Sequence, residues 1–307
     1  MSPRKSEPYT MPLDPPVRHT LPLNALRAFE ASARLGGFAR AGHELNVKPA
    51  AIAALIKLLE REYGAALFER HARGVRLTAL GEGVKTQFIT AFDAIEEAAR
   101  TLRRLAAPRR VHIVTSPALA HLWIGPRLPS LTAALAPIEI SVTAVDDPPN
   151  LKRSPFDLCV FYVETASRHQ QVLAVESLIP VCIPALARQI TRPGDLSDVR
   201  CIADVGWEDW RIWADVVMPG QSFVANGPGF SLYANAVQQA LLGAGVLMGR
   251  RSLVQRYLDS GELVAPLQHE VALNMSIVAW RLPVARDNHA VAAVAQALGE
   301  RVEIKGP

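Results

Sequence analysis

Cationic side chains near the N-terminus are the residues of this chain best suited to bind another molecule. Residues 1–110 hold eighteen Lys and Arg against eleven Asp and Glu, a balance of +7, whereas residues 111–307 hold fifteen against eighteen, a balance of −3. Guanidinium and ammonium groups bind phosphate by charge and by hydrogen bonding. The asymmetry predicts that the N-terminal third meets a polyanion, with ordinary variation in surface charge as the alternative.

Residues that serve catalysis or metal binding show no comparable grouping. The eight histidines, among them His43 and His71, are scattered without the spacing of metal ligands. No GxSxG, HExxH, P-loop or GxGxxG motif stands in a suitable context. The sequence therefore predicts a protein that is not an enzyme and that uses no metal or cofactor.

The sequence has three widely spaced cysteines and no CxxC motif; they are Cys159, Cys182 and Cys201. Their number and spacing fit neither a disulfide framework nor a zinc site. Cys159 and Cys182 lie in apolar runs and are expected to be buried in strands, with a redox-sensing pair as the alternative. This usage of cysteine indicates a reducing cytoplasm.

Length and composition set the scale of the molecule. A chain of 307 residues, half of them apolar and 20% charged, is expected to form a soluble globular protein with two or three domains. The first twenty residues contain five prolines and no apolar segment, so they predict a disordered leader and not a signal peptide. No apolar run is long enough for a membrane span.

The cationic N-terminal third has the pattern of three short helices. Leu26, Phe29 and Ala33 form one apolar stripe over residues 23–35, and a helix at 38–45 follows the glycines at 36–37. Pro49 can begin a third helix, which Gly64 would end. Its buried face is predicted to consist of Ile52, Ile56, Leu59 and Tyr63. Three helices joined by such turns predict a helix-turn-helix domain.

A basic hairpin is expected directly after these helices. Two stretches with strand character, 67–70 and 75–78, flank a turn that contains Gly74. Appended to a helix-turn-helix, such a hairpin is a wing. Its basic residues are Arg70, His71, Arg73 and Arg76.

From residue 79 to about 104 the chain contains no proline and predicts one long helix. Its apolar residues recur with 4-4-3-4-3 spacing, which resembles the seam of a coiled coil. They are Val84, Phe88, Phe92, Ile95, Ala99 and Leu102. This seam predicts dimerisation with a second copy, and the alternative is that the helix packs on its own chain.

The remainder alternates strand and helix patterns, which predicts an α/β domain with a largely parallel sheet. Strands are expected at 111–115, 138–145, 157–163, 172–184, 246–249 and 271–282, and helices at 233–245, 250–263 and 288–298. The chain is expected to pass between two subdomains near 163–171 and to return near 266–271.

The stretches LPLNALRAFE and LFERHARGVRLTALGEG resemble the N-terminal domain of LysR-type transcriptional regulators, in particular the glycine-cleavage-activator branch. The likeness continues through SPALAHLWIGPRLP, LIPVCIP and ALLGAGVLMGRR. It implies a winged helix-turn-helix that binds promoter DNA, a dimerising linker helix, and a two-lobed effector domain like a periplasmic binding protein. It also implies dimers or tetramers and activity switched by a small molecule in the cleft.

Together these patterns give a set of domain boundaries. We expect a leader at 1–20, a winged helix-turn-helix at 21–78, a linker helix at 79–106, and an effector domain at 109–307 with lobe I at 109–165 and 270–307 and lobe II at 166–269.

The third helix departs from the family at its DNA-facing positions. Lys48 stands where the family has a threonine that can cap the helix, and Ala53, Ala54 and Leu55 replace Ser, Arg or His, and Gln. Bidentate side chains discriminate bases by about 1–3 kcal/mol each, whereas alanine offers only a methyl group. The residues that the resemblance places at DNA are Arg40, Lys48, Pro49, Ala50, Ala53, Ala54, Lys57, Arg70, Arg73 and Arg76.

Three interpretations follow from this departure. The chain could bind DNA mainly through phosphate, wing and shape contacts. It could have blunted DNA binding and act through protein partners, including mixed oligomers with an intact relative. Its effector domain could instead have become the main functional part, as a small-molecule-binding module.

The effector cleft also departs from the family. Phe161 stands where the branch often has an arginine, which argues against a strongly anionic ligand or against any ligand. Ser116 is expected to donate to a ligand or to cap its own helix, and Tyr233 to fill part of the cleft or simply to pack. The residues assigned to this cleft are Thr115, Ser116, Pro117, Ala118, Phe161, Ser231, Tyr233 and Asn235.

Overall fold

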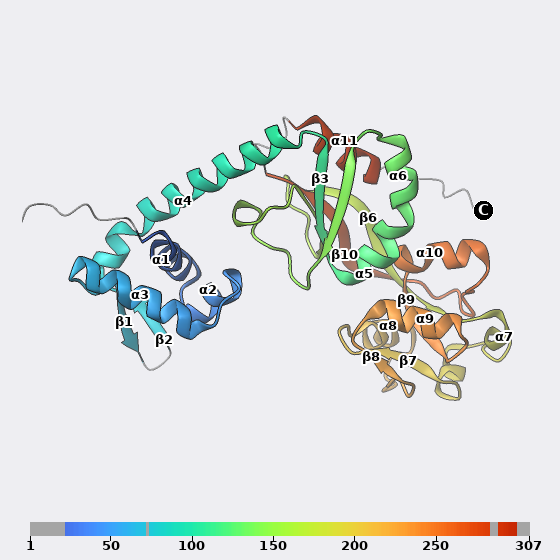
Figure 1. The fold of residues 1–307 in the computed structure, drawn as a ribbon. Coiled ribbons are helices and arrows are strands. Elements are labelled where there is room, and N and C mark those ends of the chain that lie inside the picture. The colour runs from blue at the N-terminus through green and yellow to red at the C-terminus, as the bar shows by residue number, and fades with distance from the viewer. Residues whose placement is uncertain (1–21, 72–73, 283–287, 300–307) are drawn as a thin grey trace, which may run out of the picture. The chain divides into compact units, whose positions relative to one another are not determined.

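The computed structural model describes residues 22–71, 74–282 and 288–299 (Figure 1). The expected leader at 1–20 and Arg73 lie outside the described residues. The chain divides into two compact units between Glu97 and Ala98, inside one long helix. No helix among the described residues is both long and apolar enough to cross a membrane.

The N-terminal unit is a three-helix cluster followed by a hairpin. Its helices are α1 (Leu23–Leu35), α2 (Phe38–Glu44) and α3 (Pro49–Tyr63), and its strands are β1 (Phe68–His71) and β2 (Gly74–Leu77). Phe29 lies at the centre of the core, with its ring 5.8 Å from that of Phe68 and 5.2 Å from that of Phe88. These edge-to-face contacts fix the hairpin and the next helix against α1.

The helix ends follow the turn residues of the sequence. Gly36 and Gly64 both have positive φ, at 70° and 62°, and end α1 and α3, while Asn46 (φ 53°) lies in the turn between α2 and α3. Pro49 is the first residue of α3, as predicted. The predicted buried face is wrong at Tyr63, which is 57% exposed. The core cluster ends before this last turn of the helix.

Helix α4 (Ala79–Ala106) carries the predicted seam, which divides into two parts. Val84, Phe88 and Phe92 are half-buried against the core of the N-terminal unit. Ile95 and Leu102 are 53% and 69% exposed. The first part of the seam thus packs on its own chain, and only the second part is open to a partner.

The second unit contains an eight-stranded sheet in the order β4-β3-β5-β10-β6-β9-β7-β8. Its strands are β3 (Arg110–Thr115), β4 (Glu139–Ala144), β5 (Leu158–Val163), β6 (Gln171–Val181), β7 (Cys201–Asp204), β8 (Gly229–Phe230), β9 (Val246–Arg250) and β10 (Val271–Trp280). Its helices are α5 (Pro117–Leu119), α6 (Leu128–Ala134), α7 (Pro184–Ala187), α8 (Asp209–Val217), α9 (Tyr233–Leu241), α10 (Arg251–Ser260) and α11 (His289–Gly299).

The sheet is parallel at its two ends and antiparallel in the middle. Strands β4, β3 and β5 run parallel, as do β9, β7 and β8. The long strands β6 and β10 pair antiparallel with each other and with their neighbours. The predicted largely parallel sheet is therefore too simple, because the two strands that carry the chain between the lobes run in opposite directions.

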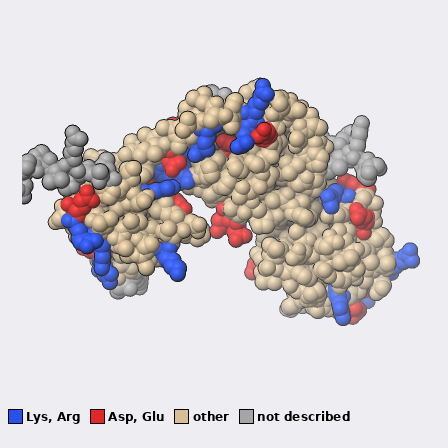
Figure 2. All heavy atoms as spheres, viewed as in Figure 1, with Lys and Arg blue, Asp and Glu red and all other residues tan. Residues whose placement is uncertain are grey.

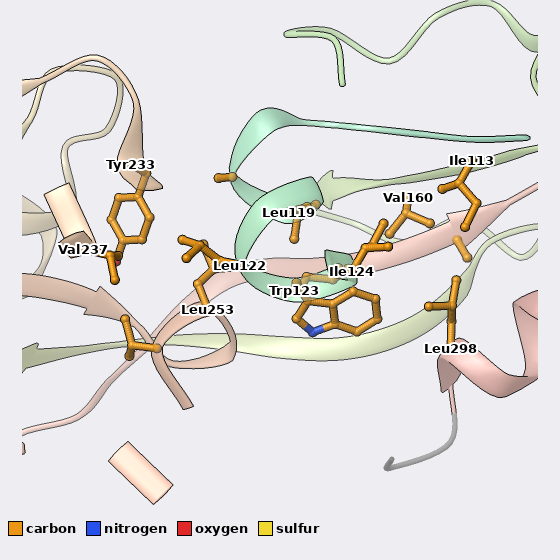
Figure 3. Close-up of a cluster of buried hydrophobic side chains, with 14 of the residues drawn as sticks. Ile113, Leu119, Leu122, Trp123, Ile124, Val160, Tyr233, Val237, Leu253 and Leu298 are labelled. Atoms are coloured by element: carbon orange, nitrogen blue, oxygen red, sulfur yellow. The ribbon is translucent and has the colours of Figure 1, made fainter. Parts of the chain in front are cut away.

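Two lobes form around the ends of this sheet (Figure 1). Lobe I holds β3, β4 and β5 with α6 and α11, and lobe II holds β7, β8 and β9 with α8 and α9. One buried cluster contains side chains of both lobes, including Leu119 of α5 and Tyr233 of α9 (Figure 3). The junction of the lobes is thus partly filled by apolar side chains.

Candidate functional site

The exposed face of α3 presents the residues that the sequence assigned to a polyanion. Lys48, Pro49, Ala50, Ala54 and Lys57 are exposed, and Ala53 is half-buried beside them. Figure 2 shows Lys and Arg side chains on the surface of the N-terminal unit, with acidic side chains nearby. The face therefore combines cations at two positions with methyl groups between them.

Lys48 occupies the N-cap of α3, and its side chain makes no capping hydrogen bond. Its carbonyl oxygen accepts the N–H groups of Ala51 and Ile52, at 2.9 and 3.4 Å. A capping oxygen would satisfy one more free N–H, and the lysine charge opposes the helix dipole. Lys48 therefore makes α3 less stable, and it places a cation at the solvent-exposed N-terminus of this helix.

Arg40 is exposed on α2, where its guanidinium Nη2 lies 3.4 Å from the carbonyl oxygen of Gly36. It shares the exposed surface of the helix-turn-helix with the cations of α3. One long contact to a carbonyl leaves its other N–H groups available for a phosphate.

The wing strands place their arginines on opposite faces. In the hairpin register Glu69 pairs with Arg76, and Arg70 pairs with Val75. Since side chains alternate across a strand, Arg76 shares its face with Glu69 and His71, and Arg70 lies on the other face. His71 Nε2 lies 3.0 Å from Glu69 Oε1. The structure exposes both arginines but does not bring them together.

Glu60 is a site residue that the sequence analysis missed. Its Oε1 accepts the N–H groups of Leu67 and Phe68, at 2.8 and 3.0 Å, and so joins α3 to the first wing strand. A hollow of about 540 Å³ lies beside it, lined by Ala54, Lys57, Glu60, Arg61, Gly64, Ala65 and Ala66. One sequence signal could have revealed this bond. Glu60 lies in the last turn of a helix, where the helix dipole disfavours a negative charge, so its carboxylate is expected to have a partner.

Thr115 and Ser116 mark the end of β3 in the effector unit. The buried Thr115 hydroxyl donates to the carbonyl oxygen of Val160 at 2.6 Å. Ser116 Oγ caps α5 and accepts the N–H of Leu119 at 3.5 Å. Pro117 begins that helix, and Ala118 is buried. Ser116 thus adopts the capping role that was one of its two expected roles.

Phe161 lies apart from the other residues assigned to the cleft. It is buried with Val114, Leu151 and Cys159, and its ring lies 5.9 Å from that of Trp280. Because strand side chains alternate, Tyr162 points to the opposite face, where it packs against the cluster shared by the lobes. The structure places Tyr162 at this junction in place of Phe161.

Tyr233 is buried at the start of α9, whereas Ser231 and Asn235 beside it are exposed. Its hydroxyl donates to the carbonyl oxygen of Met248 and accepts the N–H of Arg250, both at 2.9 Å. Burial raises the pKa of the Tyr233 phenol. The tyrosine therefore packs in the cluster shared by the lobes (Figure 3), and backbone groups of β9 satisfy its hydroxyl.

The ion pair of Arg250 with Asp209 also escaped the sequence analysis. Both side chains are buried, and two hydrogen bonds of 2.8 and 2.9 Å join them. The only signal was an arginine directly after the apolar run VLMG, because the partner lies 41 residues away. Within residues 22–71, 74–282 and 288–299, no three His, Cys, Asp or Glu side chains are grouped to hold a metal ion.

Two family models match the chain. The model described as a bacterial regulatory helix-turn-helix protein of the lysR family matches residues 23–82, and the LysR substrate binding domain matches residues 106–303. The HTH-type transcriptional regulator PerR of Escherichia coli is 34% identical over 252 residues, covering 80% of this chain and 83% of its own. The glycine cleavage system transcriptional activator of the same species is 32% identical over 250 residues, covering 80% and 82%.

Solved structures share the fold at low sequence identity. CrgA of Neisseria meningitidis, a LysR-type regulator, aligns with a TM-score of 0.52 at 16% identity, over 92% of this chain and 99% of its own. DarR of Vibrio fischeri in complex with DNA aligns with a TM-score of 0.51 at 18% identity, over 90% and 97%. The effector domain of AmpR from Citrobacter freundii aligns with a TM-score of 0.52 at 20% identity, over 62% and 96%.

Proposed function

The chain belongs to the LysR family of bacterial transcriptional regulators, with a DNA-binding helix-turn-helix and an effector domain, and from this premise we propose how it engages DNA. It binds promoter DNA mainly through phosphate, wing and shape contacts, with weakened reading of base edges. Its effector unit modulates that binding.

The observation that carries this proposal is the composition of the exposed face of α3. Lys48 and Lys57 flank Ala50 and Ala54, and all four are exposed. Lysines contact phosphates without regard to sequence, and each contact adds about one unit to the slope of log affinity against log salt. Alanine methyls have no hydrogen bond to give a base edge. This face therefore supports affinity more than selectivity.

The wing supplies the remaining contacts in the proposal. Arg70 and Arg76 lie on opposite faces of the hairpin, so one hairpin placed along a groove presents a cation to each side. We propose that Arg73, which lies outside the described residues, also contacts DNA, and the family resemblance of the segment LFERHARGVRLT supports this. Arginines read narrow minor grooves through their negative potential, and that is a form of shape readout.

A titration of DNA binding against salt tests the proposal. We expect the purified protein to shift a fragment of its own promoter region, with affinity that falls steeply as salt increases. The shift with unrelated DNA of the same length should be only modestly weaker. Arg73→Ala is expected to abolish the shift, whereas Arg211→Ala, an exposed arginine of α8, should leave it unchanged.

Loss of all binding would support the second of the three interpretations that the sequence left open. If the native protein gives no shift even at low salt, the proposal fails, and a role through protein partners or mixed oligomers takes its place. Mixing the chain with a relative that keeps the full set of base contacts would then alter the mobility of the relative's complex. A strong preference for one sequence would instead contradict the weakened base readout.

The proposal also includes assembly of the chain into dimers and tetramers. The exposed part of the α4 seam, with Ile95 and Leu102, supports dimerisation by helix pairing, and dimers build tetramers. Two subunits place two winged helices on one duplex, which multiplies the weak contacts of each. We place this activity in the cytoplasm, where promoter DNA is found.

A further inference from the structure

Arg250 is a buried cation that pairs with a buried carboxylate. It ends β9 and is 3% exposed, and Asp209, the first residue of α8, is 4% exposed. Nε and Nη2 donate to the two carboxylate oxygens in the parallel, bidentate arrangement that is strongest for this pair. Burial lowers the pKa of Arg250, whereas Asp209, together with Tyr162 and Tyr233, raises it, and the net shift is upward, so the group stays charged.

Two aromatic rings, nearly perpendicular to each other, lie against this guanidinium. Its central carbon lies 3.5 Å from the ring centroid of Trp207 and 5.0 Å from that of Tyr162. The Trp207 ring in turn lies 6.2 Å from Tyr162 and 4.7 Å from Tyr233. Tyr162 comes from β5 of lobe I, and Trp207 and Tyr233 come from lobe II. The cation therefore lies where side chains of both lobes meet.

Hydrogen bonds hold the two tyrosine rings in place. The hydroxyl of Tyr162 donates to Glu176 at 2.7 Å, and the same buried carboxylate accepts the N–H of Ser252 at 3.0 Å and its hydroxyl. The hydroxyl of Tyr233 accepts the N–H of Arg250. Strand β6, which carries Glu176, joins the two lobes. The two tyrosine rings are thus ordered by a carboxylate and by backbone groups, and not by the guanidinium beside them.

We propose that Tyr162, Trp207 and Asp209 form a guanidinium-binding cage whose resident ligand is Arg250, and that this internal cation holds the two lobes together in place of a small molecule. Two ring faces and a carboxylate fork are the chemistry that recognises a planar guanidinium. An anionic effector that paired with the same two nitrogens, Nε and Nη2, would have to displace Asp209 from Arg250.

Chemical rescue tests the cage. Arg250→Ala removes the guanidinium and leaves a buried, unpaired carboxylate, so the full-length protein should lose roughly 10 °C of thermal midpoint. Ethylguanidinium, at a concentration too low to denature, should recover a large part of this loss. Sodium chloride at the same concentration should not. A folded Arg250→Ala protein that ethylguanidinium does not stabilise would overturn the proposal.

The neighbouring arginine provides the matched control. Arg251 also makes an ion pair, 3.1 Å to Glu270, but both partners are more than a third exposed. Arg251→Ala should change the thermal midpoint little and should gain nothing from ethylguanidinium. Equal stabilisation of the two variants would show a general effect of the salt and would also overturn the proposal.

A second variant decides the matter if Arg250→Ala does not fold. Arg250→Lys keeps a charge beside Asp209 but loses the plane that stacks on Trp207. The near-ultraviolet circular dichroism of Trp207, obtained as the difference from Trp207→Phe, should be reduced in the Arg250→Lys background. An unchanged signal would overturn the proposal. The statement that Arg250 acts in place of a small molecule rests on the proposed function, whereas the cage itself does not. Because these measurements are made without DNA, a failure of the cage can be distinguished from a failure of DNA binding.

Discussion

Glu60, in the last full turn of α3, accepts the backbone N–H of Leu67 at 2.8 Å, and the same oxygen accepts the next N–H along the chain. The helix that faces DNA in the proposed function is therefore joined to the wing by one carboxylate. A buried or half-buried N–H that loses its acceptor costs about 1–3 kcal/mol. The orientation of the wing depends on that bond.

We expect Glu60→Ala to loosen the wing and to weaken DNA binding although it removes a negative charge. Amide hydrogen exchange at Leu67 and Phe68 should accelerate, and the free energy of unfolding of the N-terminal unit should fall by about 1–3 kcal/mol. Glu82→Ala, which removes the same charge from an exposed position of α4 where the side chain pairs with Lys85, is the control. If Glu60→Ala binds DNA more tightly than the native protein, the negative charge of Glu60 affects DNA affinity more than its hydrogen bonds to the wing do.

Lys48→Thr should move stability and DNA affinity in opposite directions. A threonine at the N-cap gives α3 a side-chain cap and removes a cation from the positive end of the helix dipole, so the free energy of unfolding should rise by about 1 kcal/mol. Loss of one phosphate contact should lower the salt slope by about 1. Thermal melts measure the stability and salt titrations measure the DNA affinity of the same preparation. A rise in both stability and DNA affinity would contradict a phosphate contact by Lys48.

Ala54→Arg should restore selectivity for sequence. Ala54 is exposed on α3 at the position where the family has Arg or His, and arginine is a good helix former. A bidentate contact to guanine is worth about 1–3 kcal/mol of discrimination, so the ratio of promoter to unrelated binding should increase by about tenfold. Gln238→Arg adds the same charge to the exposed face of α9 and should leave the ratio unchanged.

The two parts of the α4 seam should respond differently to substitution. Phe88→Ala removes a ring that packs on Phe29, so it should lower the free energy of unfolding by about 2–3 kcal/mol and leave the oligomer intact. Leu102→Glu places a charge on the exposed part and should dissociate the oligomer without loss of stability. Sedimentation equilibrium and urea unfolding separate the outcomes. Dissociation by Phe88→Ala alone would place the partner contact elsewhere.

The cysteines should be unreactive in the native protein. Burial raises the pKa of Cys159 and Cys201 to about 12 and that of Cys182 to about 11, from 9.0. A thiol reagent at pH 8 should label all three only after denaturant is added. Because the folded state keeps these protons, their contribution to stability is present below pH 9 and is lost as the pH rises through about 11 for Cys182 and about 12 for Cys159 and Cys201. Rapid native labelling of one thiol would revive the redox alternative.

Local sequence patterns predicted most elements of the fold. The glycines and prolines set the limits of α1 and α3 because they act on backbone torsions within one or two residues. The strand patterns at 111–115 and 157–163 match β3 and β5 to within one residue. Such patterns depend on periodicity along one element, which needs no knowledge of its neighbours.

The same patterns could not show which neighbour covers an apolar face. Val84 and Leu102 belong to one periodic seam, yet Val84 packs on the N-terminal core and Leu102 is exposed. Tyr63 continues the stripe of Ile56 but extends beyond the core. Periodicity determines the direction in which a side chain points. It does not show how far along the helix the covering surface extends.

The sequence by itself determined the class of this protein: a basic winged helix-turn-helix, an α3 face of lysines and alanines, and a two-lobed α/β unit. Those properties depend on residue type and short-range order. Only the tertiary structure decided that Tyr162, not Phe161, faces the junction of the lobes, and that Arg250 meets Asp209 there. Strand register and contacts between residues far apart in the chain set those positions, because a shift of one residue along a strand reverses which side chain is turned inward.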